Sequence, residues 1–351
     1  MPFRRRKVAI LGARSLAAQW LVRLLENHPW FELSALTSSE AIGKRYFEAV
    51  KWLAGSEPPE YAANLELAES DPKKLDADIV FSLLPGEVAL KLEPEFAKAG
   101  FAVISRAAPY RYSGKVPVIV PEVNPEHLAL LEHQQELWSG VVVADPNCTT
   151  TILALPLKPL HDTFKVKKVV ASTLQAASGA GYPGVPSLEL IDNVVPYIPG
   201  EEERTTNELL MLMGKVSNGS IEKASFETSL TCTRVPVLEG HLASVFLETE
   251  YPAKAQDAME ILREFRGKPQ ELGLPTAPRQ PIIVLEDCDR PQPRLDRLRG
   301  DVNGMSVVVG RVRGRDTDHS ILFVTLGHNL VRGAAGSSLL LAELLVAEGY
   351  A

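Results

Sequence analysis

Cysteine is scarce in this chain of 351 residues, and the few cysteines form no recognised group. Cys148, Cys232 and Cys288 are the only three, and no CxxC or Cys/His ligand spacing joins them. So few thiols exclude a disulfide framework, and their spacing argues against a zinc or iron–sulfur site. We therefore expect a cytoplasmic protein without a metal site.

Long apolar runs and an excess of positive charge are also missing. Neither a membrane-spanning segment nor a signal peptide follows the basic cluster at residues 4–7, and no internal repeat stands out. The net charge of -7 argues against a nucleic-acid partner. Apolar residues make up 45% and charged residues 23%, which is typical of a globular protein with room for two domains.

Short apolar strands alternate with helical patterns through the N-terminal part of the chain. This alternation predicts an α/β fold with a doubly wound parallel sheet of the Rossmann type. The predicted strands are residues 7–11, 31–36, 78–85, 101–105, 116–120 and 141–144, and the predicted helices are 16–25, 87–98 and 124–138.

The turn after the first strand is a candidate for cofactor binding. Only Gly12 remains of a three-glycine dinucleotide fingerprint, with Ser15 and Ala18 where later glycines could stand. Small residues still let the backbone approach a pyrophosphate closely. An ordinary βα turn remains the alternative.

The end of the second strand bears on the choice of cofactor. It reads Thr37-Ser38-Ser39 in place of an acidic residue, and hydroxyls suit a ribose 2′-phosphate better than they suit the free hydroxyl. Lys44 and Arg45 follow as cations, whereas Glu40 favours NAD. We predict NADP, with NAD as the alternative. The candidate cofactor residues in this half are Gly12, Arg14, Ser15, Leu16, Ser38 and Ser39.

Cys148 is the first candidate for catalysis. An apolar strand at 141–144 leads into Asp145-Pro146-Asn147-Cys148, and a helical run at 152–157 follows. Backbone N–H groups and the helix dipole favour an anion at such a turn, so we expect the thiol to be biased towards the thiolate. A buried cysteine without a chemical role is the alternative.

The second half of the chain is richer in strands. A glycine-rich loop at 176–184 either brings backbone amides close to a ligand or is a plain turn. The last helix is expected to return to the first domain. Predicted strands are 166–175, 226–235, 242–251, 282–285, 305–313 and 320–326, predicted helices are 206–213, 255–265 and 331–348, and 269–281 is a Pro-rich connection.

A nucleophilic cysteine needs a proton donor or acceptor, and histidine is the usual partner. His241 and His328 both stand at strand ends and rank equally by pattern. The remaining candidates are predicted to face solvent: His28, His127, His133 and His161. Arg111, Arg234 and Arg332 could hold a carboxylate or phosphate, and Glu208 reads by default as part of a solvated helix face.

Nearly the whole chain resembles the aspartate-semialdehyde dehydrogenases of the archaeal and fungal branch, which also includes malonyl-CoA reductase. The matching segments are 121–128 (PEVNPEHL), 146–150 (PNCTT), 178–186 (SGAGYPGVP), Asp192-Asn193, 234–241 (RVPVLEGH), 290–297 (RPQPRLDR) and His328-Asn329. The resemblance implies an NADP-binding domain over 1–147, completed by 328–351, and an α+β catalytic and dimerisation domain over 148–327. It also implies a homodimer or homotetramer that acts on a small molecule.

The implied reaction is the NADPH-dependent reductive dephosphorylation of L-aspartyl 4-phosphate to L-aspartate 4-semialdehyde through a thioester on Cys148. His241 would be the general acid/base, Gln175 would orient the acyl group and Asn147 would shape the oxyanion site. The implied substrate residues are Arg234 for the carboxylate, Arg111 for the phosphate and Glu208 for the amine. Ser178, Gly179, Gly181 and Asn329 match the cofactor loop and the nicotinamide contact.

Three positions depart from the family pattern. The glycine turn is altered, Arg106 replaces an asparagine before the phosphate arginine, and Met211 stands where a phosphate-binding lysine is expected. Met211 favours the alternative of a malonyl-CoA reductase, whose leaving group is a thiol. The altered glycine turn favours a second alternative, a nucleotide-binding paralogue without activity. Whether Arg106 compensates for the lysine stays open at this stage.

Overall fold

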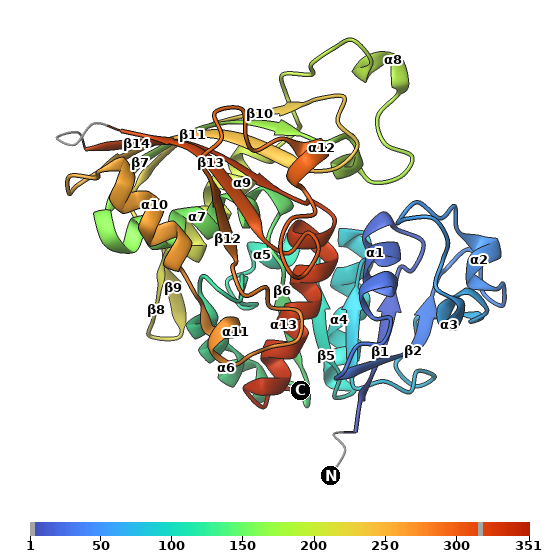
Figure 1. The fold of residues 1–351 in the computed structure, drawn as a ribbon. Helices are drawn as coiled ribbons and strands as arrows, with labels where there is room; N and C mark the ends of the chain where they lie inside the picture. The colour runs from blue at the N-terminus through green and yellow to red at the C-terminus, as the bar shows by residue number, and fades with distance from the viewer. Residues whose placement is uncertain (1–3, 315–318) are drawn as a thin grey trace.

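The computed structural model describes residues 4–314 and 319–351, which form two large β-sheets with their helices (Figure 1). The first sheet is parallel throughout, in the order β3-β2-β1-β4-β5-β6. This confirms the predicted doubly wound sheet. Its strands are β1 Arg6–Leu11, β2 Phe31–Thr37, β3 Leu67–Ala68, β4 Ile79–Ser82, β5 Ala102–Ser105 and β6 Val141–Ala144.

Helices cover both faces of the first sheet, which is why its strands read as continuous apolar runs. Val8 and Ile10 of β1 pack with α1 (Leu16–Leu24) and α13 (Gly336–Ala347), whereas Ala9 and Leu11 face α4 (Gly86–Lys98). The C-terminal helix therefore returns to the first sheet, as predicted, and lies beside α1 (Figure 1). The other helices of this half are α2 Tyr46–Ala49, α3 Glu60–Ala63, α5 Ala108–Arg111, η1 Pro125–Leu130 and α6 Leu131–Gln135.

Two predicted elements of this half are wrong. Residues 116–120 are buried but irregular, and Val118 makes only an isolated bridge to Ala144, because Pro117 cannot donate a ladder hydrogen bond. The helix predicted over 124–138 is a 3₁₀ turn followed by the short α6. Asn124 ties its start to the preceding loop, since its side chain bonds to Val120 N (2.9 Å) and Val118 O (2.8 Å).

The second sheet is mixed, in the order β10-β7-β11-β14-β13-β12. β7 lies between β10 and β11, parallel to the first and antiparallel to the second. Three helices pack on one face: α7 (Cys148–Phe164), α9 (Glu201–Leu212) and α10 (Ala255–Glu264). The strands are β7 Val166–Gln175, β10 Glu227–Arg234, β11 His241–Thr249, β12 Ile282–Leu285, β13 Val307–Arg313 and β14 Ser320–Gly327.

Short elements complete this half. The hairpin of β8 (Lys215–Ser217) and β9 (Ser220–Glu222) follows α9. The helix predicted over 331–348 begins with a π turn, η3 (Val331–Ala335), ahead of α13. The remaining helices are η2 Ala177–Ala180, α8 Ser187–Leu190, α11 Lys268–Glu271 and α12 Pro293–Asp296.

Glu93 of α4 is fully buried against the first sheet, where it accepts a hydrogen bond of 3.1 Å from the Ser105 hydroxyl. Burial raises the pKa of this carboxyl to about 7, from its ordinary value of 4.5. A group whose pKa is raised in the folded state stabilises that state below its unfolded pKa and loses the contribution as pH rises through the folded value. Stability contributed by Glu93 is therefore present at pH 4 and lost by pH 8.

We expect Glu93→Gln to remove this pH dependence. At pH 8 the variant should be more stable than the natural protein by on the order of 2 kcal/mol, because the natural protein buries a charged carboxylate at that pH, whereas the amide is neutral. At pH 4.5 the two proteins should unfold at similar temperatures. Thermal unfolding at both pH values measures the effect, and an equal difference at the two would show that Glu93 does not titrate as described.

Candidate active site

The candidate nucleophile, Cys148, lies at the strand-to-helix turn between β6 and α7. Cys148 is the first residue of α7 and keeps partial exposure. Asn147 caps this helix, since its side-chain oxygen accepts a hydrogen bond of 2.7 Å from the Thr149 N–H. The turn after a parallel strand thus places the sulfur at the carboxyl edge of the first sheet, where ligands bind in such folds.

His241, the first residue of β11, is the histidine that faces Cys148. Its Nε2 lies 3.3 Å from Sγ, and its Nδ1 accepts a hydrogen bond of 3.0 Å from Ala176 N. Because Nδ1 accepts, the neutral ring carries its proton on Nε2, so a donor points at the sulfur. His328 is held elsewhere: its Nδ1 accepts from Leu330 N and Val331 N, both 3.3 Å away. The structure therefore separates two histidines that the pattern ranked equally.

The protonation states of this pair differ from the sequence prediction. Burial, together with the negative charge of Glu201, raises the pKa of the Cys148 thiol to about 11. These effects outweigh Arg106, Arg111 and the Thr149 N–H, which favour the thiolate, so the expected thiolate bias is wrong for the free protein. Burial, assisted by Arg234, lowers the pKa of His241 to about 3. At neutral pH the pair is a thiol beside a neutral imidazole.

Alkylation of Cys148 should reveal this raised pKa. Only the thiolate reacts, so the rate of labelling by iodoacetamide should rise about tenfold per pH unit from pH 7 to pH 10. Peptide mapping resolves Cys148 from the exposed Cys288. A plateau in the Cys148 rate below pH 8 would mean that the free protein already holds a thiolate.

Glu201 joins the residues around Cys148, although the sequence interpretation did not select it. Its Oε1 accepts hydrogen bonds from Thr149 Oγ1 (3.1 Å) and Gln175 Nε2 (3.2 Å), and its Oε2 accepts one from Asn147 Nδ2 (3.0 Å). The acidic run at 201–203 is the first turn of α9, which begins earlier than predicted. Acidic side chains are favoured in the first turn of a helix, so the run at 201–203 could have located the start of α9 from the sequence.

Glu208 lies two turns further along α9 and is fully buried, so its default interpretation as a solvated residue is wrong. It accepts hydrogen bonds from Arg111 Nη1 (3.2 Å), Tyr112 OH (3.1 Å) and Asn147 N (2.6 Å). These contacts occupy both carboxylate oxygens. Glu208 therefore fixes Arg111 and the backbone beside Cys148.

Arg234 and the glycine-rich loop border the other side of the pair. Arg234 ends β10 and donates a hydrogen bond of 2.9 Å to Ala176 O. Gly179 packs so closely that a Cβ there would lie 2.6 Å from Arg234 Nη1 and 2.9 Å from His241 Cε1. The loop is thus built against the reactive residues, which favours its interpretation as a ligand loop.

A cavity of about 560 Å³ opens beyond the ends of β1, β2 and β4. Four predicted cofactor residues line it: Gly12, Arg14, Ser38 and Ser39. Gly12 has φ +76°, and a Cβ there would lie 2.8 Å from Leu83 O, so only glycine fits. Serine hydroxyls and a guanidinium fit a ribose 2′-phosphate, although Arg14 Nη1 here bonds Glu40 Oε2 at 2.5 Å.

The other predicted cofactor residues lie outside this cavity. Ser15 caps α1 by accepting a hydrogen bond of 3.2 Å from Ala18 N, and the side chain of Leu16 packs in the core. Asn329 bridges the glycine-rich loop to the start of β11, through bonds to Ser178 Oγ (2.9 Å) and Gly240 N (2.8 Å). Gly181 follows in the same loop with φ +74°.

Two of the histidines predicted to face solvent are buried. His28 Nε2 lies 2.8 Å from Glu343 Oε1 of α13, and His127 Nε2 lies 3.3 Å from Gly214 O. Segments distant in sequence cover both rings, which local periodicity does not reveal. His133 is exposed and His161 is half-buried, in partial agreement with the prediction.

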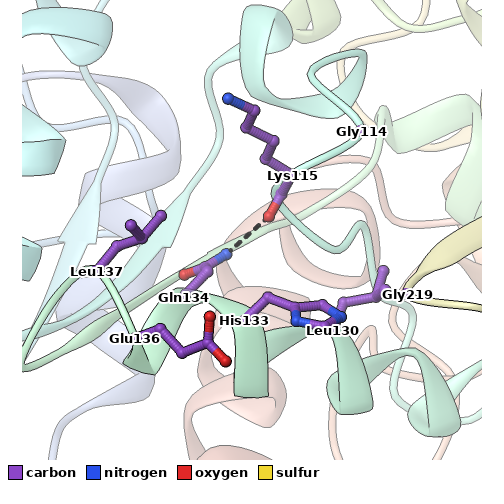
Figure 2. A pocket seen from close by; sticks show the side chains of 8 residues that line it. All are labelled: Gly114, Lys115, Leu130, His133, Gln134, Glu136, Leu137 and Gly219. Carbon is purple, nitrogen blue, oxygen red and sulfur yellow. Dashed lines mark hydrogen bonds between the residues drawn. The ribbon is translucent and has the colours of Figure 1, made fainter.

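A second cavity, of about 320 Å³, lies away from the predicted site residues (Figure 2). Lys115, His133 and Glu136 line it with exposed side chains, and Gln134 there donates a hydrogen bond to Lys115 O. Within residues 4–314 and 319–351, no His, Cys, Asp and Glu side chains group as a metal site. No helix in those same ranges has the length and apolar character needed to cross a membrane.

Known proteins resemble the chain over nearly its full length. Residues 7–131 match the model of the semialdehyde dehydrogenase NAD binding domain, and residues 157–332 match that of the semialdehyde dehydrogenase dimerisation domain. Aspartate-semialdehyde dehydrogenase of Archaeoglobus fulgidus is 48% identical over 347 residues, which cover 98% of this chain and 99% of that protein. Malonyl CoA reductase (NADP) of Metallosphaera sedula is 41% identical, with 98% of each chain covered.

The fold agrees with these sequence relationships. The crystal structure of aspartate semialdehyde dehydrogenase with NADP from Candida albicans superposes with a TM-score of 0.89 at 37% identity, covering 99% of this chain and 100% of that one. The two domain models match most of the chain, and the relatives align with nearly all of it. The chain therefore belongs to the aspartate-semialdehyde dehydrogenase family.

Proposed function

We propose that the protein is an NADPH-dependent aspartate-semialdehyde dehydrogenase, which converts L-aspartyl 4-phosphate to L-aspartate 4-semialdehyde and phosphate. This reaction belongs to the biosynthesis of the aspartate-family amino acids lysine, threonine and methionine. The observation that carries the proposal is the 3.3 Å approach of His241 Nε2 to Cys148 Sγ, at a helix start bordered by three arginines. The 48% identity to the Archaeoglobus fulgidus enzyme supports the choice of substrate.

The chemistry runs through a thioester on Cys148. The Cys148 thiol loses its proton as the sulfur attacks the acyl carbon. The bond from this carbon to the phosphate oxygen breaks, and phosphate leaves with the electron pair and takes up that proton. When bound, the cofactor supplies the hydride that reduces the acyl carbon. The carbon–sulfur bond then breaks, which releases the aldehyde and a thiolate, and the thiolate takes up one proton from water to restore the thiol. One proton is consumed overall and is carried away by the phosphate.

The residues around the sulfur divide this work. His241 Nε2–H is placed to donate to the sulfur and to the oxyanion that forms beside it. Asn147 shapes the oxyanion site, and Gln175, held by Glu201, orients the acyl group. Arg234 receives the substrate carboxylate and Arg111 the phosphate.

Glu201 is the better candidate for the substrate amine, in place of Glu208. Both carboxylates accept hydrogen bonds within the protein, but those of Glu208 come from Arg111, Tyr112 and the backbone of Asn147. Glu201 is the carboxylate whose charge acts on the Cys148 sulfur. Glu208 then acts through Arg111, which it holds in position.

Met211 no longer favours an acyl-CoA substrate. Its side chain is 7% exposed and packs in the hydrophobic core, so a lysine is not missing from the reactive site at this position. Arg204 lies on the same helix, with Nη2 3.4 Å from Glu201 Oε2, and adds a cation at the edge of the site. Both observations favour the acyl phosphate.

The second sheet supports self-association of the protein. The face opposite α7 carries exposed Ser172, Leu174 and Ser244. An arm around α8 projects beyond the sheet (Figure 1) and exposes Leu188 by 91% and Ile191 by 65%. Exposed large apolar side chains such as Leu174, Leu188 and Ile191 are typical of a subunit interface. We assign a homodimer through this face, or a tetramer of such dimers, which light scattering distinguishes.

We also propose a division into two domains. The cofactor domain would comprise residues 1–147 with 328–351, and the catalytic and dimerisation domain would comprise residues 148–327. Packing of α13 against α1 supports the return of the C-terminal segment to the first domain. All three thiols are free, which supports a cytoplasmic location.

Three assays test the function. We expect phosphate-dependent reduction of NADP by aspartate semialdehyde, at a rate far above NADPH oxidation by malonyl-CoA. Activity with the CoA ester alone would replace the proposed substrate by the one named for the Metallosphaera sedula relative. A fluorescence titration with NADPH and NADH comes first, because binding of neither would mean a paralogue without activity.

A further inference from the structure

Arg106 lies at the carboxyl end of β5, directly before the helix that carries Arg111. Its Nη1 donates to Asp145 Oδ2 at 3.2 Å, and its Nη2 donates to Gly333 O at 3.0 Å. Its own backbone carbonyl accepts a hydrogen bond of 3.0 Å from Arg111 Nη2. The Arg111 guanidinium thus contacts the backbone of Arg106, and its charge also acts on the Arg106 guanidinium.

The contact with Gly333 brings Arg106 to the reactive sulfur. Gly333 lies in the π turn η3, and a Cβ there would lie 2.5 Å from Cys148 Cβ, so this turn packs directly on the nucleophile. Arg332 of the same turn is buried and bound through two hydrogen bonds to Glu122, at 2.9 and 2.5 Å. Arg332 is thus committed to holding the turn, whereas Arg106 is the cation that reaches the sulfur from that side.

Positive charge is arranged on two sides of Cys148. Arg234 lies beside His241 and the glycine-rich loop, and Arg106 with Arg111 lies on the side of the first sheet. The substrate of the proposed reaction carries two anionic ends, a carboxylate and a phosphoryl group. One end fits Arg234, and the other fits the pair of guanidinium groups.

We propose that Arg106 is a specificity-determining residue that binds, together with Arg111, the phosphoryl group of the acyl phosphate. The inference rests on the proposed function and extends it to a position that departs from the family pattern. Asp145 is completely buried, whereas the side chain of Arg106 keeps 16% exposure. Within the described part of the chain Arg106 uses two of its five N–H donors, so donors remain for a ligand.

Arg106→Asn should raise the KM for phosphate about tenfold or more in the phosphate-dependent direction, because charge-assisted hydrogen bonds to the anion are lost. The KM for aspartate semialdehyde should change less than about twofold, since the carboxylate is held by Arg234. Arg106→Lys keeps the charge without the planar fork and should show a smaller rise. An unchanged phosphate KM in both variants would refute the proposal.

The double variant Arg106→Asn/Asp145→Asn separates phosphate binding from a structural role. If Arg106 served only to neutralise Asp145, removal of both charges would restore the phosphate KM of the natural protein, which would overturn the proposal. We expect instead that the double variant keeps the phosphate defect of Arg106→Asn, because the guanidinium that binds the anion is absent from both. Arg279→Asn, which alters an exposed arginine paired with Asp301, serves as the surface control.

A binding measurement keeps this inference distinct from the proposed function. Inorganic phosphate should protect Cys148 from iodoacetamide, and the concentration needed should rise about tenfold in Arg106→Asn. If phosphate protects Cys148 from iodoacetamide in the natural protein but not in Arg106→Asn, the phosphate site is supported. This holds even if the natural protein does not turn over aspartate semialdehyde. If the natural protein turns over aspartate semialdehyde but phosphate protects Cys148 equally in the natural protein and in Arg106→Asn, the role of Arg106 is refuted. The proposed function then stands. If Arg106→Asn does not fold, Arg106→Lys gives the same comparison.

Discussion

Replacement of Cys148 by alanine abolishes turnover, with an expected loss in kcat of about 10⁴ or more, because the covalent intermediate forms on the sulfur that this change removes. Cys148 begins α7 and is partly exposed, so a smaller side chain leaves the helix and its Asn147 cap in place. The melting temperature should therefore change little. Steady-state kinetics and thermal unfolding of the same preparation measure both effects.

Cys288→Ala is the matched control, because this cysteine is exposed and far along the chain from the reactive pair. It should retain full activity. Binding of NADPH should survive in both variants, which shows that the Cys148 variant is folded but inert. Retention of more than about a tenth of the activity by Cys148→Ala would assign the nucleophile to another residue.

His241→Asn should lower kcat by about 10²–10⁴, the usual value of a positioned proton donor. Asparagine can still accept the hydrogen bond from Ala176 N through its Oδ1, but it places no donor where Nε2 lies 3.3 Å from the sulfur. The loss should appear in kcat, with the KM for phosphate nearly unchanged, since His241 acts on the reacting atoms. Initial-rate kinetics with each substrate varied separates these terms.

His328→Asn is the control for the histidine. His328 accepts hydrogen bonds from the first residues of the π turn, and its Nε2 lies 3.4 Å from Glu239 Oε2. Its replacement should lower the melting temperature while kcat falls by less than about tenfold. Equal losses of kcat in the two variants would remove the special role given to His241.

The parallel sheet and the position of Cys148 followed from local pattern. Strands buried on both faces need apolar residues at nearly every position, so the runs at 79–82, 102–105 and 141–144 could be predicted as strands. A polar turn after such a strand, followed by a helix, lies at the sheet edge where ligands bind. These properties depend on neighbours in sequence, which is why no tertiary information was required.

The partner of Cys148 depended on strand pairing. His241 and His328 follow similar local patterns, and His241 is brought to the sulfur because β11 pairs with β7, whose end carries Gln175 and the glycine-rich loop. The choice between Glu201 and Glu208 had the same origin. Both face inward on α9, and only the position of that helix against α7 decides which carboxylate meets Asn147, Gln175 and Thr149.

The α/β architecture, the family and Cys148 as the candidate nucleophile could all be predicted from contiguous segments of the sequence. The charge state of Cys148, in contrast, depends on the tertiary structure. A helix start favours the thiolate, but burial and Glu201 come from segments distant in sequence and raise the pKa of Cys148 to about 11. The position of Arg106 also depends on the tertiary structure. In the sequence this residue is an ordinary substitution, and the packing of η3 on Cys148 brings it to the reactive sulfur.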